Sequence, residues 1–253
     1  MEVLTEERHQ LIMNSLESHN VVKVLELVEA THASETTIRR DLQLLEELGK
    51  LKRVHGGAKI IREVTPELPL TIKENLHMEE KKKIGQWVGK LIKDNEVIFI
   101  DSGTATYQVL PFLKEKKIRA VTNSIIHAQY LSSINIPTTV LGGQLKMTTG
   151  AIVGNETLKQ LEKYHFSKAL VGVNAIHHQF GLTTPEEEEA LVKESVMHHA
   201  EEVLILADHS KFEMINFVKF GELTEGKIIT DYLPSKFRSL YKEEIQIVEV
   251  KSQ

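Results

Sequence analysis

Cysteine is absent from the 253 residues of this chain. Its absence excludes disulfide bonds, thiolate zinc sites and cysteine nucleophiles, and it fits a reducing compartment. Long hydrophobic runs are also lacking, because the longest, VIFI at 97–100 and VLILA at 203–207, have the length of strands rather than of membrane helices. The N-terminal segment MEVLTEERHQ is acidic and begins a helical pattern almost at once, unlike a signal peptide. We therefore expect a soluble, cytoplasmic protein.

The chain also lacks an excess of positively charged residues. The formal net charge is −5, which excludes a nucleic-acid coat and a membrane-surface polycation. Glutamates offset the basic residues within positions 1–60, so the positive charge is local and falls at Arg39, Arg40, Lys50, Lys52, Arg53, His55 and Lys59. A footprint this small indicates that two copies of the chain would be needed to bind DNA.

Residues 34–48 have the pattern of one amphipathic helix. Apolar side chains recur at Ile38, Leu42, Leu45 and Leu48, which places them on a single buried stripe. Ser34 stands where an N-cap hydroxyl is expected. Gly49 stands where a left-handed C-terminal cap is expected, so the helix is bounded at both ends.

Two helical patterns precede this helix, at 6–18 and 23–31, and a hairpin pattern follows it at 51–61. Three short helices and a hairpin predict a winged helix-turn-helix over residues 1–61, whose last helix enters the major groove of DNA. An Arg-Arg pair alone is more often a solvated surface, so this interpretation depends on the whole pattern. The sequence leaves open whether the arginines bond guanine or phosphate. The expected DNA-binding residues are Ser34, Thr36, Thr37, Arg39, Arg40, Gln43, Lys52, Arg53 and His55.

The helical pattern weakens over residues 62–78, where two prolines predict a linker between domains. Helical order resumes at 79–94. Seven apolar segments then predict strands at 96–101, 118–122, 138–141, 168–174, 203–207, 227–230 and 245–250. Several are apolar throughout, as are strands that are covered on both faces. Their alternation with helices predicts an α/β domain over residues 79–253 with a largely parallel sheet.

Polar loops follow several of these strands, at the edge where parallel sheets bind ligands. The first loop, DSGTAT at 101–106, combines a glycine with hydroxyl groups, which suits a phosphate but equally caps a helix. TNS at 122–124 and the glycine pair at 142–143 follow the next two strands, and for the glycine pair alone a tight turn is the simpler interpretation. Lys211, after the fifth strand, would neutralise a phosphate or be an ordinary surface lysine.

The run TIRRDLQLLEELGKLKRVHGGA at 37–58 resembles the signature of the DeoR family of bacterial transcription regulators. The segments DSGTAT, TNS, LGG and ADHSKF resemble that family's effector domain, which is similar in fold to ribose-5-phosphate isomerase and coenzyme A transferases. The resemblance covers about residues 8–231. It implies the effector-binding residues Asp101, Ser102, Gly103, Thr104, Thr106, Thr122, Asn123, Ser124, Gly142, Gly143, Asp208 and Lys211.

The same resemblance implies a homo-oligomeric repressor, a dimer or tetramer, that a phosphorylated sugar releases from double-stranded operator DNA. The segment HSKFEMINFVKFG is similar to family members that govern sugar uptake by the phosphotransferase system. On that similarity we expect a fructose phosphate as effector, with fructose 1-phosphate first and tagatose 6-phosphate next.

An enzyme is the alternative. A sugar-phosphate isomerase needs a carboxylate near the substrate carbon, but the segment after the fourth predicted strand, GVNAI at 172–176, has no acid. Glutamates 186–189 would supply a base, or they are the acidic first turn of a helix. Adjacent histidines at 177–178 and 198–199 should point apart, without a partner at metal-ligating spacing. We therefore expect no catalysis, no cofactor and no metal site.

Overall fold

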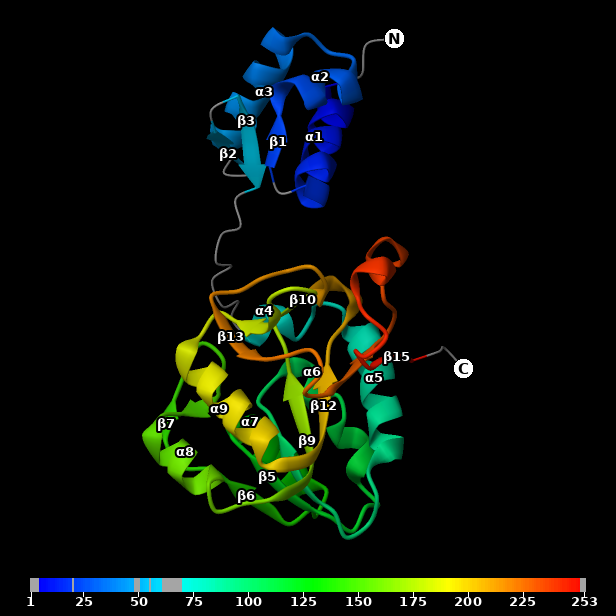
Figure 1. The fold of residues 1–253 in the computed structure, drawn as a ribbon. Helices are drawn as coiled ribbons and strands as arrows, with labels where there is room; N and C mark the ends of the chain where they lie inside the picture. The colour runs from blue at the N-terminus through cyan, green and yellow to red at the C-terminus, as the bar shows by residue number, and fades with distance from the viewer. Residues whose placement is uncertain (1–4, 20, 48–50, 55, 61–69, 251–253) are drawn as a thin grey trace. The chain divides into compact units, whose positions relative to one another are not determined.

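The computed structural model describes residues 5–19, 21–47, 51–54, 56–60 and 70–250. The chain divides into two compact units, residues 1–63 and 64–253, which Figure 1 shows as the blue part and the cyan-to-red part of the ribbon. None of the helices described is long and apolar enough to cross a bilayer.

The first unit is a winged helix-turn-helix, as predicted. Its elements are α1 (Thr5–His19), β1 (Val21–Lys23), α2 (Val24–Thr31), α3 (Glu35–Glu47), β2 (Leu51–Val54) and β3 (Gly57–Ile60). Strand β1 was not predicted; it pairs antiparallel with β3 and completes a sheet of order β1-β3-β2. The predicted helix residue Leu48, the cap Gly49 and the wing residue Lys50 lie outside the described residues.

The core of this unit forms where the apolar stripes of the helices meet the sheet. It contains Ile12, Leu16, Leu27, Ile38, Leu42, Leu45 and Leu51, all at most 1% exposed. Leu11 of α1 is exposed. The spacing of the remaining positions therefore predicted the packing of α3 correctly.

The second unit is built on a parallel sheet of seven strands. They are β4 (Val97–Ile100), β5 (Arg119–Thr122), β6 (Thr138–Val140), β9 (Phe166–Gly172), β12 (Ala200–Leu206), β14 (Lys227–Thr230) and β15 (Ile247–Glu249), in the order β15-β14-β12-β9-β4-β5-β6. Each falls within or overlaps one of the seven predicted strands. Strand β12 begins three residues earlier than predicted, and β9 ends at Gly172, which leaves Val173 and Asn174 in the loop beyond.

Neighbouring residues along these strands pack on opposite faces of the sheet. On β4, Ile98 and Ile100 belong to one core cluster and Phe99 to the other. Residues of α5 (Met78–Leu91) and α7 (Ile125–Ser133) cover the first face, and residues of α8 (Asn155–Leu161) and α9 (Glu187–His198) cover the second. Burial on both faces explains why the strands are apolar throughout.

Smaller elements of this unit were not predicted. Strands β10 (Ala175–His177), β11 (Gly181–Thr184) and β13 (Val218–Gly221) form an antiparallel sheet, and β7 (Gln144–Leu145) pairs with β8 (Ile152–Val153). The remaining helical turns are α4 (Leu70–Lys73), α6 (Thr104–Tyr107), η1 (Leu110–Leu113), η2 (His209–Lys211) and η3 (Ser235–Leu240).

The predicted linker extends too far along the chain. Helix α4 lies within residues 62–78, and its first residue, Leu70, donates its backbone N–H to the carbonyl of Thr148 at 3.2 Å. Residues 70–78 thus fold with the second unit.

Candidate functional site

Helix α3 presents one polar face to solvent in the first unit. The Ser34 hydroxyl accepts the backbone N–H of Thr37 at 3.1 Å, which is the predicted N-cap. Ile38, Leu42 and Leu45 turn inward, while Thr36, Arg39, Arg40 and Gln43 are exposed and Thr37 is half-buried. The predicted base-reading side chains therefore share one accessible face.

The two arginines of this face differ in their surroundings. Arg39 is held by Glu35, one helical turn earlier, with its Nη2 2.6 Å from Glu35 Oε1. Arg40 makes no ion pair or hydrogen bond with any other described residue. Arg40 is consequently the guanidinium that is available without breaking an existing contact.

The wing adds further basic groups. Lys52 faces Lys59 across the β2–β3 pair, and both side chains are exposed, as is Arg53. The backbone N–H of Arg53 donates to Glu46 of α3 at 2.8 Å, which fixes the wing to the helix. His55, the remaining predicted DNA-binding residue, lies outside the described residues.

A buried ion pair that was not predicted joins α1 to α3. Asp41 Oδ2 lies 2.5 Å from Arg8 Nε, and its Oδ1 lies 3.1 Å from His9 Nε2. Burial acts to raise the pKa of Asp41, but the bonds from Arg8 and His9 hold it below its ordinary value. Asp41 therefore orients the recognition helix instead of facing solvent.

The second unit contains a cavity of about 190 Å³ at the carboxyl ends of β4, β9 and β12. Five of the predicted effector-binding residues line it: Ser102, Gly103, Thr104, Asp208 and Lys211. The position follows from the parallel sheet, in which the loops after adjacent strands meet at one edge. The helix after Gly103, α6, has only four residues, so it supplies less dipole than the motif had indicated.

Asp101 lies beneath this cavity. Its Oδ2 pairs with Lys193 of α9 and accepts the backbone N–H of Gly172 at 3.0 Å. Lys193 Nζ also donates to the carbonyl of Gly172 at 3.0 Å. Because these bonds engage the carboxylate, Asp101 positions Lys193 and the β9 loop, and Lys193 itself reaches the cavity wall.

Four lysines and two acids line the cavity: Lys73, Lys81, Lys193, Lys211, Glu189 and Asp208. Burial lowers the pKa of Lys73 to about 8, so its amine is still mostly protonated at pH 7. Glu189 lies in the acidic first turn of α9, as the sequence indicated, and it is buried in the cavity wall, where it accepts the Thr149 hydroxyl at 2.7 Å. The lysines other than Lys211, and Glu189, were not predicted as site residues.

Thr106, Thr122, Asn123 and Ser124 are buried and do not line the cavity. The Thr106 hydroxyl lies 2.6 Å from the carbonyl oxygens of Asp101 and Gly103, and that of Thr122 bonds the carbonyl of Ile100 at 2.7 Å. Ser124 caps α7 and lines a recess of about 20 Å³ next to the cavity. Asn123 Nδ2 donates to the carbonyl of Ile152, while its Oδ1 is buried and has no hydrogen-bond partner.

The glycine pair does not reach the ligand cavity. Gly142 bonds to Thr157 and Gln160 of α8, and a Cβ on Gly143 would lie 2.2 Å from Thr157 Oγ1. Gly143 is therefore needed for close packing against α8 and β8, whereas Gly142 is held by its backbone bonds to α8. The structure therefore does not bring the two glycines to the cavity with the other predicted effector-binding residues.

His177 and His178 do not point apart as expected. Their rings stack with centroids 4.5 Å apart, and both approach Glu213, with His178 Nδ1 2.8 Å from Glu213 Oε2. The Tyr241 hydroxyl donates to the other oxygen of Glu213 at 2.8 Å. The carboxylate comes from a distant segment, so sequence spacing alone did not show it.

The two units match two known domain families. Residues 8–64 match the DeoR-like helix-turn-helix domain, and residues 76–232 match the DeoR C terminal sensor domain. The second match covers more than half of the chain. The loops that line the cavity thus belong to a domain described as a sensor.

Relatives are similar over most of their length. The chain is 40% identical over 250 residues to the uncharacterized HTH-type transcriptional regulator FruR of Bacillus subtilis, which covers 98% of this chain and 100% of that protein. It is 34% identical over 211 residues to the lactose phosphotransferase system repressor of Lactococcus lactis, covering 81% and 82%. Ribose-5-phosphate isomerase A from Neisseria gonorrhoeae aligns with 56% of this chain and 55% of that chain at 19% identity and a TM-score of 0.41, a similarity too low to support an argument about chemistry. On both domain matches and the full-length relatives, the chain belongs to the DeoR family of transcriptional regulators.

Proposed function

We propose that this protein is a repressor of a sugar-catabolism operon of the phosphotransferase type, and that a phosphorylated sugar releases it from its operator. The observation that carries the proposal is a lysine-rich cavity in the sensor domain of a chain that also has a free recognition face on α3. A relative named as a lactose phosphotransferase system repressor supports the class of operon. Fructose 1-phosphate is our first candidate effector, and tagatose 6-phosphate is the second.

The charge of the cavity favours a ligand with a phosphate group. Four lysines face it, whereas its acids are Glu189, Asp208 and, beneath the wall, Asp101. The lysines outnumber the acids by one, which favours an anionic group such as a phosphate, and Ser102 and Thr104 offer hydroxyl donors. Glu189 and Asn174 are then placed to accept or donate hydrogen bonds to sugar hydroxyls.

Regulation requires that the effector bind two states of the protein with different affinity. We propose that the chain acts in the cytoplasm as a homo-oligomer, with one α3 and one wing for each half-site of the operator. The small basic footprint of a single chain supports this arrangement. The effector would lower the population of the arrangement that fits both half-sites.

An isomerase is the alternative, and we propose that the protein is not an enzyme. Asp101 is engaged by Lys193 and by a backbone N–H, and Glu189 is bonded by Thr149, which disfavours either carboxylate as a base and leaves Asp208 as the cavity acid with an unbonded oxygen. Turnover of a pentose or hexose phosphate by the purified protein, lost in Glu189→Gln, would contradict this proposal.

The decisive experiment is binding of the purified protein to its own upstream DNA at two salt concentrations, with and without a panel of sugar phosphates. We expect sequence-selective binding that weakens with salt and that one sugar phosphate abolishes. Selective binding that no sugar phosphate alters would contradict the sensor assignment, and absence of selective binding would contradict the repressor.

A further inference from the structure

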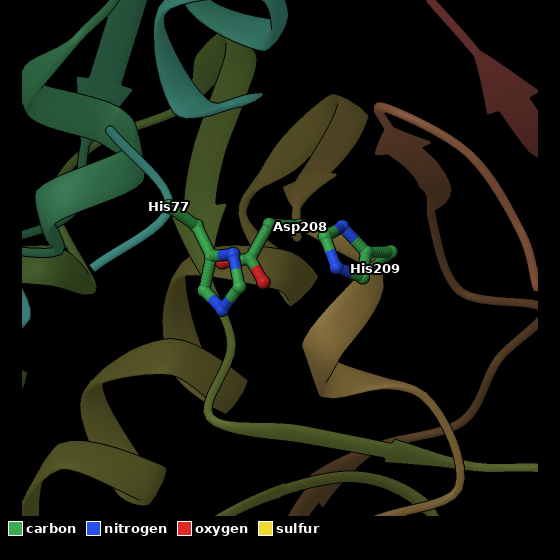
Figure 2. A group of neighbouring side chains, drawn as sticks. All are labelled: His77, Asp208 and His209. Carbon is green, nitrogen blue, oxygen red and sulfur yellow. The ribbon is translucent and has the colours of Figure 1, made fainter. Parts of the chain in front are cut away.

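Three side chains with metal-binding groups converge beside the effector cavity. They are His77, just before α5, and Asp208 and His209, which follow β12. One ligand atom from each lies within 4.8 Å of the others. Figure 2 shows the His77 ring and the Asp208 carboxylate next to each other, with the His209 ring beside them. Asp208 also lines the cavity.

His209 is held by a carboxylate behind it. Its Nδ1 lies 2.7 Å from Asp231 Oδ2, and its backbone N–H donates to Asp231 Oδ1 at 2.7 Å. Tyr232 stacks on the ring with centroids 4.5 Å apart. Because the carboxylate is an acceptor, Nδ1 carries the proton and the lone pair of Nε2 remains for a ligand bond. A histidine oriented in this way by a carboxylate is a common arrangement in metal sites.

Only one of the two carboxylate oxygens of Asp208 accepts hydrogen bonds from described residues. Its Oδ1 accepts the backbone N–H of Ser210 at 3.0 Å and the Ser210 hydroxyl. Its Oδ2 has no hydrogen-bond partner among the described residues, although the side chain is 1% exposed.

His77 has a left-handed backbone conformation, which is uncommon for a residue other than glycine. Its φ of 51° and ψ of 41° lie in the left-handed region, which costs a residue other than glycine about 1 kcal/mol. The ring meets His209 edge-on at 4.9 Å between centroids. Neither of its nitrogens has a hydrogen-bond partner among the described residues. The turn thus directs an unbonded imidazole at the other two groups.

We propose that His77, Asp208 and His209 form a binding site for a divalent transition-metal ion of the Zn²⁺ class. Two imidazole nitrogens and one carboxylate oxygen are the donor set that Zn²⁺ prefers over Mg²⁺ or Ca²⁺, which favour oxygen ligands. Three protein ligands leave a fourth position for water or for an oxygen of a bound ligand. The site stands independently of the DNA-binding function.

Two lysines oppose the ion. Lys81 and Lys211 both act on Asp208, and Lys81 Nζ is bonded to the carbonyl of Lys73 at 2.7 Å. Their charge lowers the affinity of the site for a cation. Removing Lys211 should therefore tighten metal binding, which is a result that a purely structural role of the histidines would not produce.

The other histidine–carboxylate group of the described residues is less suited to a metal. Both oxygens of Glu213 already accept hydrogen bonds, from Tyr241 and from His178. Its two imidazoles are stacked at 26° between ring planes, and a nitrogen of each lies near the same oxygen, Glu213 Oε2, at 3.7 and 2.8 Å. This group is a matched control, because it has the same donor chemistry in a satisfied network.

The test is a Co²⁺ titration of the untagged, chelator-treated full chain, followed by visible absorption and then by Zn²⁺ displacement. We expect one ion per chain with the spectrum of low-coordinate Co²⁺. His77→Gly suits the left-handed backbone, so it removes the ring without unfolding the turn, and together with His209→Gln it should weaken binding at least tenfold. His178→Ala should leave it unchanged, and Lys211→Ala should strengthen it.

Thermal melting of each variant will show that it is folded. Absence of the Co²⁺ spectrum, or equal affinity in wild type and in the His77→Gly/His209→Gln variant, would overturn the metal site. Loss of binding in His178→Ala alone would also overturn it and would assign the ion to the Glu213 group. None of these results depends on operator DNA, so failure here leaves the regulator proposal to its own test.

Discussion

Of the two arginines on the recognition helix, Arg40 is the one that would break no existing contact when it binds DNA. It is exposed and unpaired among the described residues, whereas Arg39 must first leave Glu35. A good bidentate contact to a base is worth about 1–3 kcal/mol, so Arg40→Ala should lower operator affinity roughly 5- to 150-fold. Fluorescence anisotropy with labelled operator at fixed salt measures it.

Lys90→Ala is the control for Arg40, because it removes one exposed positive charge in the sensor domain. It should leave operator affinity unchanged. Effector binding should be the same in wild type and both variants. Wild-type operator affinity in Arg40→Ala would remove Arg40 from the interface.

Lys211 should separate ligand response from DNA binding. It lines the cavity three positions after Asp208, far in the sequence from the DNA-binding unit. In Lys211→Ala we expect wild-type operator affinity and loss of release by the sugar phosphate, since a phosphate would lose an ionic partner. Band-shift titrations with effector measure both quantities. A normal response to effector would show that the phosphate lies elsewhere in the cavity.

The pH dependence of effector binding should report Lys73. Burial lowers the pKa of its amine to about 8, and an anion prefers the protonated form. Effector affinity should therefore change little near pH 7 and should fall as pH rises above the Lys73 pKa of about 8. Calorimetry across this range measures it. In Lys73→Arg, whose guanidinium does not titrate, the decline should move to higher pH; an unchanged profile would exclude Lys73 from ligand contact.

At the scale of elements, the packing of α1 on α3 depends on Asp41. Asp41→Ala would leave the Arg8 guanidinium buried without its carboxylate, at a cost of about 3 kcal/mol to the DNA-binding domain. Circular dichroism should show an earlier melting transition. Fluorescence of Trp87, the sole tryptophan, reports the sensor domain alone and should melt as in wild type. Coincident earlier melting of both signals would contradict a local effect.

The same pair gives the DNA-binding domain a defined acid sensitivity. The pKa of Asp41 is lower in the folded state than in the unfolded state, so its contribution to stability is complete above the ordinary carboxyl pKa. That contribution is lost as pH falls from there through the folded pKa. The Asp41→Ala variant should lack this part of the pH dependence.

Most helices and strands were predictable because their buried residues follow a regular pattern in the sequence. The seven parallel strands are covered on both faces, so each is an apolar run, and the stripe on α3 has regular helical spacing. Strand β11, by contrast, reads GLTT and is buried at every position, with threonines bonded to distant groups. The two-residue strands β7 and β8 are too short to show any period. Such elements are defined by long-range pairing, which no local pattern contains.

At the scale of the whole molecule, the cavity was only partly predictable. Loops after β4 and β12 were found because parallel strands end at a common edge. Lys73, Lys81, Glu189 and Lys193 were missed because they come from α4, α5 and α9, and only the packed fold brings those helices to that edge. His77 was missed for the same reason. A charged residue inside a helix pattern looks like an ordinary solvated one until its neighbours are known.

A repressor that an effector controls requires that effector binding in the sensor domain change the affinity of the DNA-binding domain for the operator. Leu70, Lys73 and Leu76 line the cavity, and in the sequence they directly follow the stretch that joins the two units. A ligand bound in this cavity would therefore contact the first described segment of the sensor domain. Thermodynamic linkage then requires that operator DNA weaken effector binding by the same factor by which effector weakens operator binding, about 5- to 150-fold.

Calorimetric titration of the sugar phosphate into free protein and into protein saturated with operator measures this reciprocity. The two factors should agree within error. Arg40→Ala is the control. At an operator concentration that saturates the wild type but not this variant, the effector affinity of the variant should equal that of the DNA-free protein. If operator DNA leaves effector affinity unchanged in wild type, the sugar phosphate does not distinguish the DNA-competent state. The cavity would then bind its ligand without controlling the repressor.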